Sequence, residues 1–217
     1  RVPDEVVSAM ARQPTDLADP RVPRLVADCE AGMKALLKTD RAEVFFYTAN
    51  GHGGWEAVIA NLVAAGSTIL VPGTGHFSDG WAEQVEAFGG RALRTPYTEG
   101  WPIDAAAVET AMREDTAHRI GAVFVVHTDT ASGTTSDLAA LRRALDAAAH
   151  PALFVVDVVA SLGAAPFAMD ALGVNVAIGA SQKGLMLQPG LAFVAADERA
   201  MAAAHRNPAP RFYWDWE

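Results

Sequence analysis

The feature that most constrains the fold is a repeated alternation of short apolar runs with longer amphipathic segments. Each apolar run has the length of a strand and is rich in β-branched or aromatic residues, as buried strands are. The runs are Val44–Tyr47, Thr68–Val71, Ala122–Val126, Leu153–Val156 and Val174–Ile178, with a further candidate at Leu191–Val194. Segments with apolar residues at helical spacing lie between them, at Trp55–Ala64, Asp79–Phe88, Asp104–Arg113 and Asp137–Ala148. The alternation is typical of βα units, so we predict an α/β fold with a mostly parallel central sheet flanked by helices.

The first 40 residues form a segment of different character. Residues 3–40 have a helical pattern that Pro14, Pro20 and Pro23 should interrupt, because proline disrupts a helix interior. We expect residues 1–40 to pack on the domain or on a partner subunit, and residues 41–217 to form the main domain.

Charge and hydropathy exclude two classes of partner. The 217 residues include 17 Lys and Arg against 26 Asp and Glu, for a net charge of −9, and contain no basic run. Nucleic acid is not an expected partner, because binding it requires a cationic patch. The apolar runs are far shorter than the roughly 20 residues that span a bilayer, so no membrane partner is expected either.

The chain has a single cysteine, Cys29. One cysteine can form no internal disulfide and no multi-cysteine metal site, so we expect no metal and a reducing, cytoplasmic location. Cys29 itself is expected to be a small buried hydrophobic residue.

A glycine-rich turn, Asn50–Gly54, follows the first predicted strand and precedes a helix. Glycines let the backbone approach a ligand, and the N–H groups that open a helix bind anions, so the turn is a candidate phosphate site. The pattern alone is equally consistent with a turn that serves only packing. It matches neither the nucleotide P-loop nor the dinucleotide-binding glycine motif.

An acidic residue and a lysine follow two later strands. Asp157 ends the run Leu153–Val156, and Lys183 lies in a loop after Val174–Ile178. The carboxyl ends of parallel strands meet at one sheet edge, where ligands bind in open α/β folds. Most lysines are solvated surface charges, but Lys183 lies between apolar strands in a loop flanked by Gly and Met, so we expect it to be buried. Burial would favour the neutral amine that forms Schiff bases. An amine, a carboxylate for a pyridinium nitrogen and a phosphate cradle are the set that pyridoxal 5′-phosphate (PLP) requires.

Five segments, in this order, resemble the class V aminotransferases, and most closely the serine–glyoxylate and alanine–glyoxylate aminotransferase branch. They are Asn50–Ala57, Gly75–Phe77, His127–Asp137, Val156–Leu162 and Gly179–Leu191. The resemblance extends from about Val2 to Trp216, and Ser181–Met186 is its most specific part. It implies the large domain of a PLP-dependent transferase of fold type I, with residues 41–217 as the PLP-binding domain, and a homodimer whose active site lies at the interface.

The resemblance also implies roles for nine residues. Lys183 would hold PLP as a Schiff base and move the proton between the substrate α-carbon and the cofactor. Asp157 would pair with the ring nitrogen, Val159 would pack on one ring face, and Phe77 would stack on the other. Thr130 would hydrogen-bond the phenolic oxygen of the ring or groups near it. The phosphate would be bound by Asn50, Gly51, His52 and Gln182.

Some residues near these motifs have simpler interpretations. Trp55 and Trp81 are interpreted as core or interface aromatics, and His127 either as a satisfied buried histidine or as a site residue. Asn50 stands where many relatives carry a small hydroxyl residue, which removes one side-chain donor from the phosphate turn.

The reaction implied is transfer of an amino group from a small amino acid, serine or alanine, to a 2-oxo acid such as glyoxylate. A PLP-dependent lyase or desulfurase of the same fold is one alternative, although Cys29 is too early in the chain to serve a desulfurase. A non-catalytic ligand-binding domain is another, against which the intact Lys183 and Asp157 argue. The family binds the substrate carboxylate with an arginine of a C-terminal domain. We expect that arginine beyond Glu217, in a longer enzyme.

Overall fold

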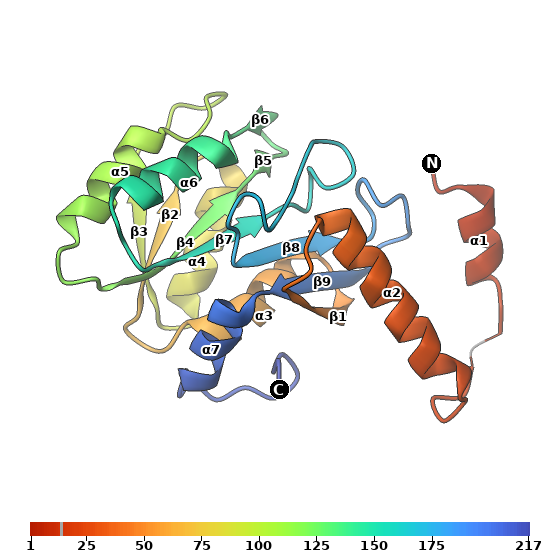
Figure 1. Cartoon of the computed structure of the whole chain (residues 1–217). Coiled ribbons are helices and arrows are strands. Elements are labelled where there is room, and N and C mark those ends of the chain that lie inside the picture. The colour runs from red at the N-terminus through yellow and green to blue at the C-terminus, as the bar shows by residue number, and fades with distance from the viewer. Residues whose placement is uncertain (14) are drawn as a thin grey trace.

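The computed structural model describes residues 1–13 and 15–217 and has a seven-stranded central sheet (Figure 1). The strand order is β1 (Glu43–Ala49), β9 (Gly190–Ala196), β8 (Val176–Ala180), β7 (Leu153–Asp157), β4 (Ile120–Val126), β2 (Thr68–Pro72) and β3 (Arg91–Thr95). Two short strands, β5 (Thr128–Asp129) and β6 (Thr134–Thr135), pair separately. The helices are α1 (Asp4–Met10), α2 (Arg21–Leu37), α3 (Gly51–Leu62), α4 (His76–Ala87), α5 (Ala105–Glu114), α6 (Leu138–Ala147) and α7 (Glu198–Arg206).

The sheet is parallel except at β9. The pairs among β8, β7, β4, β2 and β3 are all parallel, whereas β9 is antiparallel to both β8 and β1. Strands β8 and β9 are joined by the short loop 181–189, and a parallel pair would need a crossover of a dozen or more residues. The predicted mostly parallel sheet flanked by helices is therefore confirmed, with one reversed strand.

Helices cover both faces of the sheet, and alternate strand residues divide the core in two. In β4, Val123 and Val125 belong to the cluster that includes residues of α5 and α6. Phe124 and Val126 belong to the cluster on the opposite face, with residues of α3, α4 and α7. This period of two is what a strand buried on both faces requires, and it explains the continuous apolar run.

The predicted helices form, but two begin earlier than their apolar pattern. Helices α5 and α6 start immediately after Asp104 and Asp137, whose side chains cap them. Helix α3 begins at Gly51 rather than Trp55, and α4 at His76 rather than Asp79. Their first turns are glycine-rich or polar, so hydrophobic periodicity does not detect them.

Strand β3, helix α7 and the short strands β5 and β6 have no counterpart in the sequence prediction. Strand β3 is a sheet edge with the partly exposed sequence Arg-Ala-Leu-Arg-Thr, and α7 buries only Ala200 and Ala204. Neither β3 nor α7 has enough apolar residues on one face to be recognised from hydrophobic periodicity. The prediction that Val44–Tyr47 is a buried strand is wrong in part, because β1 is the other edge and Phe46 is 37% exposed.

The N-terminal segment is helical, as expected, and extends away from the sheet (Figure 1). In α2 only Leu37 is buried, and Cys29 is exposed, so the expectation of a buried cysteine is wrong. Pro23 does not interrupt α2, because it lies in the first turn, where its missing N–H has no intrahelical acceptor. Pro14 lies outside the described residues. No helix among those described is both long enough and apolar enough to cross a bilayer.

Candidate functional site

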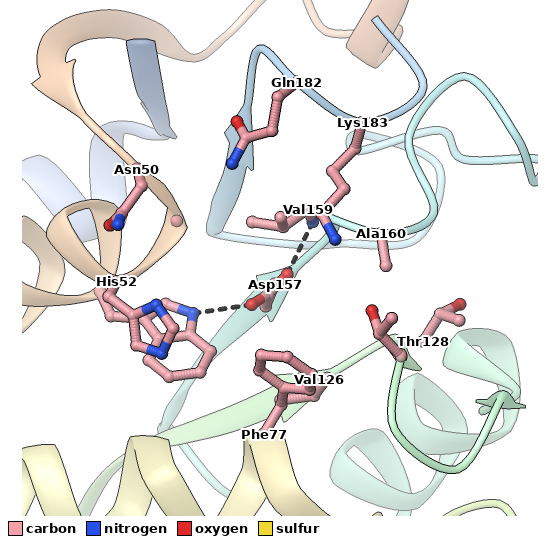
Figure 2. Close-up of a pocket in the computed structure, with 13 residues that line it drawn as sticks. Asn50, His52, Phe77, Val126, Thr128, Asp157, Val159, Ala160, Gln182 and Lys183 are labelled. Atoms are coloured by element: carbon pink, nitrogen blue, oxygen red, sulfur yellow. Dashed lines mark hydrogen bonds between the residues drawn. The ribbon is translucent and has the colours of Figure 1, made fainter. Parts of the chain in front are cut away.

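A pocket of about 240 Å³ opens at the carboxyl edge of the sheet, between the ends of β4, β7 and β8 and the first turns of α3 and α4 (Figure 2). All nine residues singled out in the sequence line it. They are Asn50, Gly51, His52, Phe77, Thr130, Asp157, Val159, Gln182 and Lys183. The connections that follow β1, β2, β4, β7 and β8 are distant in sequence and meet in this one cavity.

The glycine-rich turn forms the N-terminus of α3. Asn50 is the N-cap, and its side-chain oxygen accepts from the Gly53 amide at 3.1 Å, while its carbonyl accepts from Gly54 at 3.1 Å. Within the described residues, no hydrogen bond is made by the amides of Gly51 and His52, which as the first helical residues have no intrahelical acceptor. Two donors and the positive end of the helix dipole therefore remain for an anion.

The walls beside this turn suit a phosphorylated ligand. A Cβ atom on Gly51 would lie 3.0 Å from Val159 Cγ2, so any larger residue there would make a tight contact with the Val159 side chain. The Gln182 side-chain amide lines the same wall, and its NH2 group can donate to a phosphate oxygen. Its Oε1 atom is buried without a hydrogen-bond partner among the described residues and, as an acceptor, would need a donor from elsewhere in a ligand. These observations fit the phosphate group of PLP.

Asp157 is the last residue of β7 and is only 5% exposed. Its Oδ1 accepts from the Val159 amide at 2.6 Å, and its Oδ2 accepts from Trp55 Nε1 at 2.7 Å (Figure 2). Burial raises the pKa of Asp157 to about 6, although both hydrogen bonds and the charge of Lys183 oppose that rise. A buried carboxylate of this kind favours a cationic partner in the pocket, such as a protonated ring nitrogen.

Lys183 lies in the loop between β8 and β9, and its side chain points into the pocket above Asp157 (Figure 2). The residue is exposed, so the expectation of a buried amine is wrong. The proximity of the amine to the acid does not depend on that burial, because successive strands bring both residues to one edge.

Asp129, which the sequence motifs did not single out, connects Phe77 to the turn that contains Thr130 through hydrogen bonds. Asp129 is fully buried, and its Oδ2 accepts from the Phe77 amide at 2.9 Å while its Oδ1 accepts from the Ala131 amide at 2.9 Å. Thr74 Oγ1 donates a weaker bond of 3.3 Å to Oδ2. Asp129 therefore fixes the first turn of α4 relative to the turn between β5 and β6.

Four further residues line the pocket and were not among those singled out: Trp55, Val126, Thr128 and Ala160. Interpreting Trp55 as a core aromatic is incomplete, because it is buried and also donates to Asp157. The spacing between Gly51 and Trp55 could have indicated this second role. Once α3 begins at Gly51, residue 55 lies four positions later on the same helix face as the phosphate turn.

His127 is not one of the lining residues. It is buried, and its Nδ1 lies 2.8 Å from Ser161 Oγ. Burial lowers its pKa, which favours the neutral ring. Of the two interpretations of His127, the structure supports the satisfied buried histidine.

Comparison with known proteins agrees with this geometry. The family model described as aminotransferase class-V matches residues 10–207. The chain is 40% identical over 216 residues to an L-aspartate–glyoxylate aminotransferase of Paracoccus denitrificans, covering 99% of this chain and 54% of that protein. It is 37% identical over 221 residues to a serine–glyoxylate aminotransferase of Methylorubrum extorquens, covering 100% of this chain and 55% of that protein.

Among solved structures, the chain is similar to an aspartate aminotransferase of subgroup IV from Thermus thermophilus, with a TM-score of 0.89 and 29% identity. That match covers 99% of this chain and 59% of the other. The fold is therefore that of the PLP-dependent transferases of fold type I, as predicted. The chain spans about half the length of the curated relatives that it matches. Its sequence and its fold together show that it belongs to the class V aminotransferase family.

Proposed function

We propose that this chain is the PLP-binding large domain of a longer aminotransferase, which transfers an amino group from a small amino acid to glyoxylate or a similar 2-oxo acid. Residues 41–217 form that domain in this proposal, and residues 1–40 pack on it or on a partner subunit. The two curated relatives described above differ in the named amino donor but share glyoxylate in their names. That agreement supports the acceptor more strongly than the donor.

The observation that carries the proposal is the meeting of Lys183, Asp157 and the α3 N-terminus in one pocket. When bound, PLP supplies an aldehyde that condenses with amines and a ring that accepts electrons from the substrate α-carbon. Each of the three groups matches one part of that molecule: the aldehyde, the ring nitrogen and the phosphate.

Each of the pocket residues has a separate role in this proposal. Lys183 binds the cofactor covalently through Nζ and afterwards carries the proton removed from the substrate α-carbon. Asp157 holds the proton on the ring nitrogen. Phe77 and Val159 enclose the two ring faces, and Thr130 orients the ring through its hydroxyl group.

The phosphate is held mainly by backbone donors in this proposal. The amides of Gly51 and His52 supply the anion site of the α3 N-terminus, and Asn50 shapes the turn. The Gln182 side chain contributes a further hydrogen bond. The His52 imidazole is exposed and has no catalytic part.

For the amino donor we propose serine or alanine. The pocket residues described include two side chains that can carry positive charge, Lys183 and His52, and both lie in the cofactor region. A donor with a second carboxylate, such as aspartate, would need a further cation. The arginine that binds the common α-carboxylate is expected beyond Glu217, and a cytoplasmic homodimer completes the proposal.

The test uses the full-length enzyme. Borohydride reduction of the protein loaded with PLP should leave a stable adduct that peptide mapping assigns to Lys183. Half-reactions with serine, alanine and aspartate, followed by the loss of the aldehyde absorbance, then identify the donor. Rapid conversion by aspartate alone would refute the small-donor assignment. Release of ammonia and pyruvate from serine would identify a lyase, and no spectral change with any amine would indicate a non-catalytic binding domain.

A further inference from the structure

The carboxylate of Asp157 is held by two donors that differ in kind. One is the backbone amide of Val159, at 2.6 Å from Oδ1, and the other is the indole of Trp55, at 2.7 Å from Oδ2. The amide belongs to the same turn as the acid and moves with it. The indole belongs to α3, so of these two donors it is the one that fixes the carboxylate relative to the phosphate turn.

The indole is itself immobilised by aromatic neighbours. Trp55 is 2% exposed and stacks on Trp81 at a centroid distance of 5.2 Å and an angle of 11°. Trp81 in turn stacks on Phe124 of β4 at 4.6 Å. The ring centroids of His52 and Phe77 lie 4.7 Å and 6.3 Å from the Trp55 ring centroid. A donor packed in this way can bind the carboxylate without a further loss of side-chain freedom.

We propose that Trp55 is a positioning residue, which holds Asp157 as an oriented carboxylate toward the ring nitrogen of the cofactor. The inference rests on the proposed function. A neutral donor that binds a buried carboxylate stabilises its charged form, and only the charged form can pair with a protonated ring. Because Trp55 lies one helical turn after Gly51, the same helix also sets the distance between the phosphate site and the ring site.

The chain offers a matched control. Trp81 is as deeply buried as Trp55 and belongs to the same stack, but its Nε1 has no hydrogen-bond partner among the described residues. Trp55→Phe and Trp81→Phe therefore remove similar volumes from the same cluster. Only Trp55→Phe removes a donor from Asp157.

The first experiment measures PLP affinity of the full-length enzyme by absorbance titration of the cofactor-free protein. We expect Trp55→Phe to weaken binding by about 10-fold or more, the effect of losing one hydrogen bond to a charged group, and Trp81→Phe to change it by less than about 3-fold. Equal losses in the two variants would reduce Trp55 to a packing role and overturn the inference. If the wild-type enzyme binds no PLP, the proposed function fails instead.

The second experiment needs no cofactor. Thermal unfolding of the cofactor-free protein is measured from pH 5 to 8, each tryptophan variant being compared with its Asp157→Asn double mutant. The difference in stability within each pair reports the protonation of Asp157. In Trp55→Phe, the pH at the midpoint of this difference should rise by about one unit, because a donor that stabilised the carboxylate is lost. In Trp81→Phe the midpoint should not change. An unchanged midpoint in Trp55→Phe would overturn the inference even if PLP affinity fell.

If Trp55→Phe does not fold, the wild-type protein still provides a test. The indole N–H resonance of Trp55 should shift as Asp157 titrates and stop shifting in Asp157→Asn, whereas the Trp81 resonance should not respond. A Trp55 resonance that is independent of pH would show that the bond to the carboxylate is absent and would refute the positioning role.

Discussion

At the scale of single residues, Lys183 is the side chain on which the proposed chemistry depends most. Lys183→Ala should lower turnover by about 10³-fold or more, because both the covalent attachment and the proton carrier are lost. Steady-state assays with serine and glyoxylate measure the loss, and mass spectrometry after borohydride reduction should find no adduct. Lys34→Ala, on α2, is the control and should retain normal activity. Near-normal turnover of Lys183→Ala would refute its assigned role.

Asp157 should make the cofactor-free protein sensitive to pH. Its pKa is raised by burial from 3.8 to about 6, so the folded state binds a proton more tightly than the unfolded state. Stability therefore falls as the pH rises from about 4 to above 6, and the ionised acid costs about 3 kcal/mol at neutral pH. On acidification from pH 7 to 5, the free energy of unfolding of the cofactor-free wild type should therefore rise relative to that of Asp157→Asn. The buried His127 and His150, whose pKa values burial lowers, destabilise both proteins equally in this range and cancel in the difference. Parallel pH profiles of the two proteins would contradict the prediction.

Asp129 should matter although it is not one of the pocket-lining residues. Asp129→Ala removes the acceptor of the Phe77 and Ala131 amides and should destabilise the protein by about 2 to 4 kcal/mol, measured by chemical denaturation. Asp129→Asn keeps one acceptor and should lose less. Because Phe77 and Thr130 lose their common anchor, PLP affinity should fall in the same order. Equal affinities in the wild type and both variants would show that the anchor has no influence on the pocket.

The sequence motifs predicted which residues line the pocket. They did not predict how deeply each residue is buried or which hydrogen bonds it makes. Lys183 was expected to be buried and is exposed, because burial depends on what covers the loop and not on the loop itself. The contacts of Trp55 and Asp129 were missed for a similar reason. A hydrogen bond between residues 55 and 157 depends on how α3 packs on the sheet over β8 and β9, which no local pattern encodes.

At the scale of elements, the close approach of α3 to the sheet depends on its glycines. A Cβ on Gly54 would lie 2.7 Å from Ile178 Cγ2 of β8, so in Gly54→Ala either the helix or the Ile178 side chain must shift. We expect a destabilisation of about 1 to 3 kcal/mol and weaker phosphate binding, measured by chemical denaturation and PLP titration.

Gly32 provides the contrast, because it lies inside α2 and a Cβ added to it would meet no atom within 4 Å. Gly32→Ala should stabilise by up to about 1 kcal/mol through helix propensity alone. A Gly54→Ala variant as stable as Gly32→Ala would show that α3 is free to shift.

The elements that the sequence predicted best are those buried on a continuous apolar surface, such as β4 and β7. Strand β3 and helix α7 were missed because tertiary neighbours stabilise them and their own patterns are polar. The early starts of α3 and α4 belong to the same group. A first turn that faces a ligand site is built from glycine and polar residues, so its sequence is that of a loop.

At the scale of the whole molecule, the parallel order of the sheet explains why residues so distant in sequence share one pocket. Right-handed βα units return each strand in the same direction, so every connection of this kind ends at the same edge. The overall class could therefore be predicted from alternation alone. The reversal of β9 could not, because it depends on the length of the loop that carries Lys183.

The residues that line the pocket are far apart in the sequence, and this distance affects when the site can form during translation. The anion-binding turn is synthesised first, and the amine at position 183 emerges from the ribosome more than a hundred residues later. With Lys183 as the proposed covalent anchor, a nascent polypeptide cannot bind the coenzyme covalently until nearly all of this domain has been translated. In that proposal, covalent attachment of the coenzyme follows the synthesis of most of the sheet rather than initiating its assembly.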